Sequence, residues 1–145
     1  MKTTETIAVA ADHAGFPLKA ALVDVLAKEG YEVLDLGATG PESVDYPDFA
    51  DRLAKTIERG GAARGVLVCG SGIGISIAAN RHACVRAALC HDTEDAALAR
   101  QHNNANVIAF AGRKTDTADA AAMLRVFLET EFEGGRHSRR VAKMS

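Results

Sequence analysis

Residues 66–80 read Val-Leu-Val-Cys-Gly-Ser-Gly-Ile-Gly-Ile-Ser-Ile-Ala-Ala-Asn, and this stretch decides the fold prediction. The opening Val-Leu-Val run is typical of a strand that is buried on both faces. Glycine at positions 70, 72 and 74 then predicts a turn into a helix, with backbone N–H groups pointing into one small space. Such a space suits a phosphate or an oxygen that becomes negative during a reaction. Cys69, at the entrance of the turn, is predicted as the reactive group.

Outward from this stretch, apolar runs with strand character alternate with segments of helical periodicity. Strands are expected at 7–11, 31–36, 66–68, 85–90 and 107–110. Helices are expected at 17–30, 45–60, 77–79, 92–101 and 115–129. The alternation predicts an α/β fold: a single-domain, Rossmann-like, five-stranded parallel sheet with helices on both faces. The polar, basic sequence after Glu133 is expected to be a tail that becomes helical again near Val141.

Residues with reactive or ligand-binding side chains follow three of the predicted strands. Asp12 and His13 follow the first strand, Cys69 opens the central turn, and Arg113 follows the fifth strand. Right-handed crossovers place the carboxyl ends of parallel strands at one edge of the sheet, where ligands bind. We therefore expect these side chains to gather there.

Composition excludes several classes of protein. The chain has 145 residues, of which 48% are hydrophobic, and a net charge of -2, so it offers no general attraction to nucleic acid or to an anionic membrane. Three cysteines without a Cys-x-x-Cys pair argue for a reducing compartment. The polar N-terminus shows no signal peptide, and no apolar run approaches the roughly 20 residues of a membrane span. We expect a cytoplasmic protein.

Several known motifs do not fit the glycine turn. No Gly-Lys-Ser/Thr follows it, so it is not a Walker A loop, and Ile75 stands where the dinucleotide fingerprint has its third glycine. A hydrolase nucleophile elbow around Ser71 would need glycines at 69 and 73. The histidines and cysteines lack the spacing of a zinc site, so no metal and no cofactor are expected.

Five stretches carry a family resemblance. They read Ala-Asp-His-Ala-Gly at 11–15, Asp-Tyr-Pro at 45–47, Cys-Gly-Ser-Gly-Ile-Gly-Ile-Ser-Ile-Ala-Ala-Asn at 69–80, Arg-Gln-His-Asn-Asn at 100–104 and Gly-Gly-Arg-His at 134–137. Together they closely resemble the type B ribose-5-phosphate isomerase family, which also holds galactose-6-phosphate and allose-6-phosphate isomerases. The resemblance implies a metal-independent enzyme of the pentose phosphate pathway. It also implies a homodimer or homotetramer, with the active site at the subunit interface and a C-terminal tail that reaches the partner.

The resemblance also implies roles for individual residues. Cys69 would move the proton between C1 and C2 of the sugar, and His102 would open the furanose ring with help from Asp12. The Ser71 hydroxyl and Asn103 would bind the reacting end of the sugar. Backbone amides that hold the enediolate oxygen are implied at Gly70, Gly72, Ile73 and Gly74. Contacts to the phosphate and the rest of the substrate are implied for His13, Arg113, Arg136 and Arg140. One branch of the family has glycine at position 69 and a glutamate base at position 75, so Cys69 and Ile75 place this chain in the cysteine branch.

Each assignment has a structural alternative. A helix N-terminus and nearby cations lower the pKa of a thiol, which makes Cys69 a credible base, but most free cysteines are small buried hydrophobes. His102 suits an exposed helix end, Asp12 suits a helix cap, and Tyr46 suits either packing or substrate contact. Arg136 and Arg140 would be a solvated tail by default, but they share one face if the tail is helical.

Three functions remain open from the sequence. The first is an isomerase that interconverts D-ribose 5-phosphate and D-ribulose 5-phosphate through an enediolate. The second keeps the chemistry but takes a hexose 6-phosphate such as allose or galactose phosphate. The third is a non-catalytic phosphate-binding module, which explains the glycine turn but not the thiol, the histidine and the arginines that accompany it.

Overall fold

The computed structural model describes residues 5–145 of the chain. Over this range the chain forms five strands: β1 (Thr6–Ala11), β2 (Glu32–Asp35), β3 (Arg64–Cys69), β4 (Ala87–Leu89) and β5 (Val107–Ala111). Six helices are formed over the same range: α1 (Phe16–Lys28), α2 (Tyr46–Glu58), α3 (Ile73–Asn80), α4 (Thr93–Asn103), α5 (Thr117–Glu129) and α6 (Arg136–Met144). The predicted α/β fold is confirmed.

The sheet is parallel throughout, with the strand order β2-β1-β3-β5-β4. The chain adds β2 on one side of β1 and β3 on the other, so the topology switches direction between β1 and β3. Ala11 pairs with Val68, and Cys69 pairs with Ala111, which brings the carboxyl ends of three neighbouring strands to one level. A crevice outside such a switch point is where open α/β sheets bind ligands.

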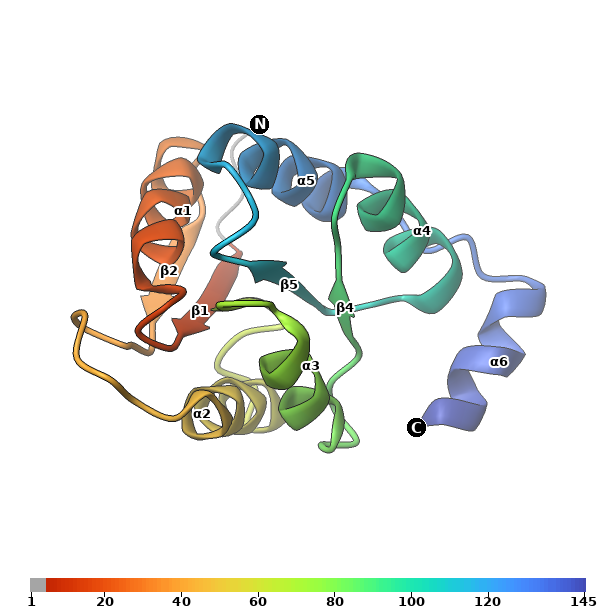
Figure 1. Ribbon diagram of the computed structural model, residues 1–145. Helices are drawn as coiled ribbons and strands as arrows, with labels where there is room; N and C mark the ends of the chain where they lie inside the picture. Colours follow the sequence, from red (N-terminus) through yellow and green to blue (C-terminus); the bar gives the residue numbers. More distant parts are fainter. Residues whose placement is uncertain (1–4) are drawn as a thin grey trace.

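Helices cover both faces of the sheet (Figure 1). Helices α1, α4 and α5 pack on one face, and α2 and α3 pack on the other. In β1, Ile7 and Val9 point to the first face, and the small side chains of Ala8 and Ala10 point toward α2. All four residues are fully buried, which is why the strand sequences are apolar on both faces.

Strand β4 is shorter than the predicted 85–90 because asparagine side chains bind the neighbouring backbone. The Asn80 side chain accepts from Ala87 N (2.7 Å) and donates to Ala87 O (2.9 Å), so it replaces a missing strand at the outer edge of the sheet. The Asn106 side chain accepts from Arg86 N and donates to Cys84 O, each at 2.8 Å. Backbone N–H and C=O groups that a longer strand would pair with a neighbouring strand are therefore hydrogen-bonded to asparagine side chains.

Helix α6 begins at Arg136, five residues before the point expected from the sequence. Gly134 and Gly135 both have positive φ and turn the chain into the helix. His137 and Val141 form its buried face, whereas its basic residues stay exposed. Figure 1 shows α6 standing beyond the β4 edge, where it packs mainly against α4. None of the helices over residues 5–145 combines the length and apolar character needed to cross a membrane.

Candidate active site

A pocket of about 440 Å³ lies at the switch point, outside the carboxyl ends of β1 and β3. Three loops and the first turns of α2 and α3 line it, so residues far apart in the sequence meet here, as predicted for the strand ends. The predicted site residues that border it are Asp12, His13, Tyr46, Cys69, Gly70, Ser71, Ile73, Gly74 and Arg113.

Cys69 is the last residue of β3, and its side chain borders this pocket. The residue is 4% exposed, and the Gly72 N–H donates to its sulfur at 3.2 Å. An N–H that donates to sulfur stabilises the thiolate, the nucleophilic and basic form. The sulfur therefore meets a cavity and a hydrogen-bond donor in addition to aliphatic neighbours, which a purely structural cysteine does not require.

Gly72 has a φ of +76° and directly precedes α3. A Cβ there would lie 2.5 Å from Leu89 Cδ1 and 2.9 Å from the backbone of Phe110, so only glycine fits. This tight turn directs the Gly72 N–H to the sulfur of Cys69, and Gly72 itself does not border the pocket. Ile73 and Gly74, in the first turn of α3, do border it, so the positive end of the α3 dipole faces the pocket.

We expect Gly72→Ala to destabilise the protein more than Gly60→Ala does. Gly60 also has a positive φ, of +81°, but nothing lies within 4 Å of the Cβ position. Gly60→Ala should therefore cost only the left-handed strain, about 1–2 kcal/mol in the free energy of unfolding. Gly72→Ala adds the clash with Leu89 and Phe110, about 1–3 kcal/mol more. Urea denaturation measures both, and equal losses would show that the β3–α3 turn is not tightly packed.

Two further contacts shape the pocket wall at glycine positions. A Cβ at Gly74 would lie 2.5 Å from the Tyr46 ring, so the absence of a side chain lets the phenol lie on the first turn of α3. A Cβ at Gly70 would lie 3.1 Å from Nη1 of Arg113, so this guanidinium lies against the turn. A phenol and a cation thus flank the entrance of α3.

Asp12 and His13 are held by backbone groups. Asp12 is 6% exposed, and its Oδ1 accepts from Gly15 N at 2.9 Å. Gly15 is the N-cap of α1, and no side chain within residues 5–145 caps this helix, so Asp12 holds the turn before α1 and does not cap it. Its side chain also borders the pocket. His13 Nδ1 accepts from Val44 N at 3.1 Å. Because Nδ1 is an acceptor, the neutral ring carries its proton on Nε2, which is then a hydrogen-bond donor.

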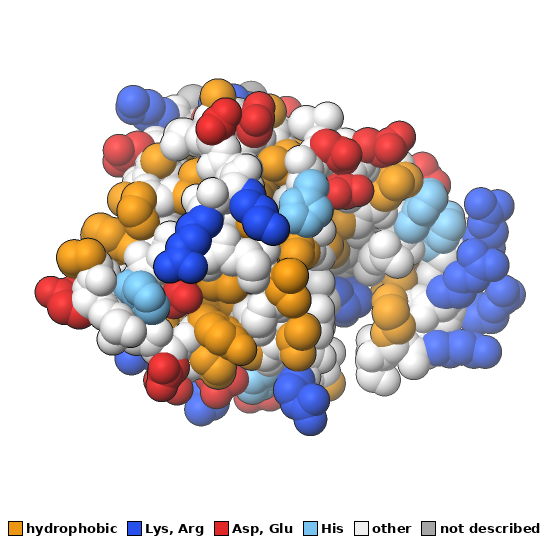
Figure 2. All heavy atoms as spheres, viewed as in Figure 1, with side chains coloured by type: hydrophobic (Ala, Val, Ile, Leu, Met, Phe, Trp, Pro, Cys, Tyr) orange, Lys and Arg blue, Asp and Glu red, His pale blue; other side chains and the backbone are white. Residues whose placement is uncertain are grey.

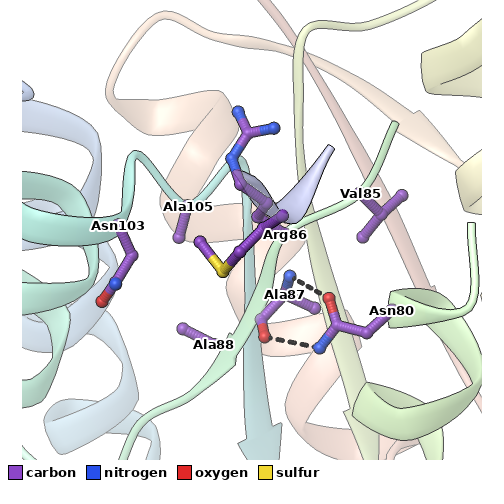
Figure 3. A pocket seen from close by; sticks show the side chains of 8 residues that line it. Asn80, Val85, Arg86, Ala87, Ala88, Asn103 and Ala105 are labelled. Atoms are coloured by element: carbon purple, nitrogen blue, oxygen red, sulfur yellow. Dashed lines mark hydrogen bonds between the residues drawn. The ribbon is translucent and has the colours of Figure 1, made fainter. Parts of the chain in front are cut away.

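Four predicted site residues lie elsewhere in the chain. Asn103 borders a second pocket, of about 350 Å³, beside the edge strand β4, together with Asn80, Arg86 and Met144 (Figure 3). His102 is in the last turn of α4, and Arg136 and Arg140 are exposed on α6. Within one chain, the structure does not bring His102, Asn103, Arg136 or Arg140 to the Cys69 pocket.

His137 and Glu133 have no predicted role, yet both contact the predicted His102. The rings of His102 and His137 stack with centroids 4.3 Å apart, and Glu133 Oε1 lies 4.0 Å from His102 Nε2. Burial is the main cause that lowers the pKa of His137, followed by the positive charges of His102 and Arg136, so this imidazole stays neutral to a lower pH than usual. The only signal in the sequence was the shared Gly-Gly-Arg-His stretch at 134–137.

Cys69 and Cys90 are expected to differ in alkylation. Burial, and then the negative charge of Asp95 and Asp92, raises the pKa of Cys90 to about 12. Its thiol therefore stays protonated up to strongly alkaline pH and should not react with iodoacetamide in the native protein at pH 8. Cys69, which borders a cavity, should react before Cys90 does. Peptide mass spectrometry after limited alkylation checks this order, and labelling of Cys90 before Cys69 would contradict it.

The sequence matches the Ribose/Galactose Isomerase family over residues 7–144. The chain belongs to this family. Ribose-5-phosphate isomerase B of Escherichia coli is 43% identical over 135 residues, which cover 93% of this chain and 91% of that protein. Among solved structures of the ribose/galactose isomerase family, the ribose 5-phosphate isomerase of Thermotoga maritima is 46% identical with a TM-score of 0.96, covering 98% of both chains.

The type B ribose 5-phosphate isomerase of Trypanosoma brucei gives a TM-score of 0.94 at 43% identity, covering 98% of this chain and 97% of that one. The family resemblance drawn from the sequence is thus confirmed. For this ribose/galactose isomerase, the residue roles inside the pocket remain predictions, and the structure supplies their geometry.

Proposed function

We propose that this chain, as one isomerase domain over residues 1–145, interconverts D-ribose 5-phosphate and D-ribulose 5-phosphate in the cytoplasm. The observation that carries the proposal is the Cys69 sulfur, which borders the switch-point pocket beside a backbone N–H and the N-terminus of α3. Isomerisation needs a base for a hydrogen next to a carbonyl, and it needs donors for the resulting oxyanion. Relatives with full-length similarity carry the name ribose-5-phosphate isomerase B.

The reaction follows from these groups without an external oxidant. The Cys69 thiolate removes the C2 proton of the open-chain aldose, and the electron pair forms the C1–C2 double bond of an enediolate. N–H groups of the turn at 70–74 and the Ser71 hydroxyl stabilise the oxyanion. The hydroxyl proton of O2 then moves to O1, and the thiol returns its proton to C1, which gives the ketose. Because the proton that leaves C2 is replaced at C1, the substrate and product are isomers.

The substrate phosphate needs donors and positive charge. His13, with its proton on Nε2, and Arg113 border the pocket and supply one donor and one cation. An arginine offers two parallel charge-assisted bonds to phosphate, so Arg136 and Arg140 suit the same task. Both are four residues apart on α6 and therefore lie on one face of it.

A second copy of the chain would complete each site. Ile73 and Ile77 on α3 are 52% and 60% exposed, so an apolar strip runs from the pocket along α3. Figure 2 shows the body hollowed beside the basic α6, which leaves room for another molecule. We assign the ring-opening step to His102 of the partner, with Asp12 as a helper, and contacts to Asn103, Arg136 and Arg140 of the partner. The assembly is then a homodimer or a homotetramer.

A coupled assay on ribose 5-phosphate tests the function. Purified protein is given ribose, allose and galactose phosphates in turn, with a chelator present throughout. We expect turnover of the pentose, with kcat/KM well above that on either hexose. Faster turnover of a hexose phosphate would show that the substrate is a hexose phosphate, with the same isomerisation chemistry. Binding of ribose 5-phosphate without exchange of its C2 proton in deuterated water would show that the chain is a non-catalytic binding module.

A further inference from the structure

A cluster of three metal-ligating side chains lies where the end of α4 meets the start of α6. It consists of His102, Glu133 and His137, whose ligand atoms all lie within 4.8 Å of one another. Glu133 Oε1 lies 4.0 Å from His102 Nε2 and 3.9 Å from His137 Nε2. None of the three belongs to the described lining of the Cys69 pocket.

The backbone holds the cluster together. Glu133 N donates to Gln101 O at 3.1 Å, and His137 N donates to Gly134 O at 3.1 Å. The first bond holds the connection between α5 and α6 against the last turn of α4, and the second closes the turn that begins α6. The cluster has one anchored and two adjustable members, because the side chain of His137 is 10% exposed whereas those of His102 and Glu133 are 41% and 53% exposed.

We propose that this cluster binds a divalent transition-metal ion, Zn²⁺ in the first instance, and that the bound ion inhibits the isomerase by occupying His102. The inhibitory half rests on the proposed function, whereas metal binding does not. Two imidazoles and one carboxylate form a donor set that zinc, copper, nickel and ferrous iron prefer over magnesium and calcium. With three protein ligands, such an ion keeps at least one position open for water.

The three side chains must move slightly closer together to bind one ion. Ligand atoms at about 2.0–2.1 Å from a tetrahedral ion lie about 3.4 Å apart, and the two distances to Glu133 are 4.0 and 3.9 Å. The stacked rings of His102 and His137, inclined by 13°, must also turn so that their lone pairs converge. The exposed side chains of His102 and Glu133 have the freedom to make both movements.

Occupation of the cluster would remove the group assigned to ring opening. A nitrogen lone pair that is bound to a metal cannot take up a proton, so His102 would be withdrawn from the reaction. The ion would act at the α4–α6 contact and not at the thiol. This difference separates the proposed site from ordinary zinc binding to Cys69.

Calorimetric titration with zinc chloride tests the binding site on the full chain. Cys69→Ala removes the competing thiolate at the pocket, and we expect it to keep one ion per chain with unchanged affinity. Glu133→Gln and His137→Gln should weaken binding by more than about tenfold, while the exposed neighbour Glu131→Gln serves as the matched control and binds as the wild type does. Unchanged affinity in both cluster variants, or loss of the ion in Cys69→Ala, would overturn the site.

Inhibition is tested on the same proteins by assay with ribose 5-phosphate. Zinc should inhibit the wild type and Glu131→Gln reversibly, with activity restored by chelator. Glu133→Gln should retain its activity in the absence of metal and need more than about tenfold higher zinc for half inhibition. Full zinc occupancy without inhibition would overturn the inhibitory half. If the chain does not turn over ribose 5-phosphate at all, the proposed function fails while the calorimetric result still decides the metal site.

Discussion

Cys69→Ala is expected to lower kcat on ribose 5-phosphate by about 10²–10⁴-fold, the contribution of a positioned base. The substitution leaves the donors of the glycine turn in place, so KM should change little. The sulfur is nearly buried, and within residues 5–145 the Gly72 N–H is its hydrogen-bond partner, so its removal should leave the fold intact. Steady-state kinetics with the coupled assay measure kcat and KM separately.

Cys84→Ala provides the control for a thiol outside the pocket. Cys84 is half-buried, and its thiol contacts Ala54 O at 3.5 Å. It should keep the wild-type kcat. If Cys69→Ala turns over at the wild-type rate, the base is another group in the pocket, and Asp12 becomes the first candidate because its carboxylate borders the same space.

Two variants of low activity are expected to regain activity when their chains form a mixed dimer. Cys69→Ala and His102→Asn are each expected to have low activity as homodimers. When both chains are co-expressed, a mixed dimer contains one site with both wild-type groups and one site with neither. Random pairing makes half of the dimers mixed, so the mixture should recover about a quarter of the wild-type activity.

The recovered activity decides where His102 acts. If His102 served the Cys69 of its own chain, every site in a mixed dimer would lack one group and no activity would return. Differently tagged subunits allow the mixed dimer to be purified, and it should then show about half of the wild-type kcat per dimer. The placement of His102 at the α4–α6 contact, apart from the Cys69 pocket, is the reason to expect recovery.

The sheet was predictable because its strands are buried on both faces. Ile7 to Ala11 and Val66 to Val68 are apolar without interruption, and only a strand between two helical layers requires that pattern. The edge strand β4 was predicted too long, since its neighbours Cys84 and Arg86 bind an asparagine side chain that lies 20 or more residues away in the sequence. Local patterns do not contain such contacts.

The pocket was predictable to the extent that strand ends define it. Asp12, Cys69 and Arg113 each follow a strand, so parallel topology alone brings them to one edge. Tyr46 was uncertain from the sequence because its position depends on the missing side chain at Gly74, a contact between α2 and α3. The contacts of His137 were not predictable, because they depend on how α6 docks against α4.

The outlying position of α6 has a consequence for the hydrogen exchange of its backbone amides. Helix α6 is attached mainly through α4 and buries only His137 and Val141, whereas the central strands are sealed between two layers. In dilute solution its amides should therefore exchange with deuterium far sooner than those of β1, β3 and β5. If a second molecule covers the helix, that exchange slows as protein concentration rises, so the deuterium uptake of the nine residues of α6 becomes a measure of self-association.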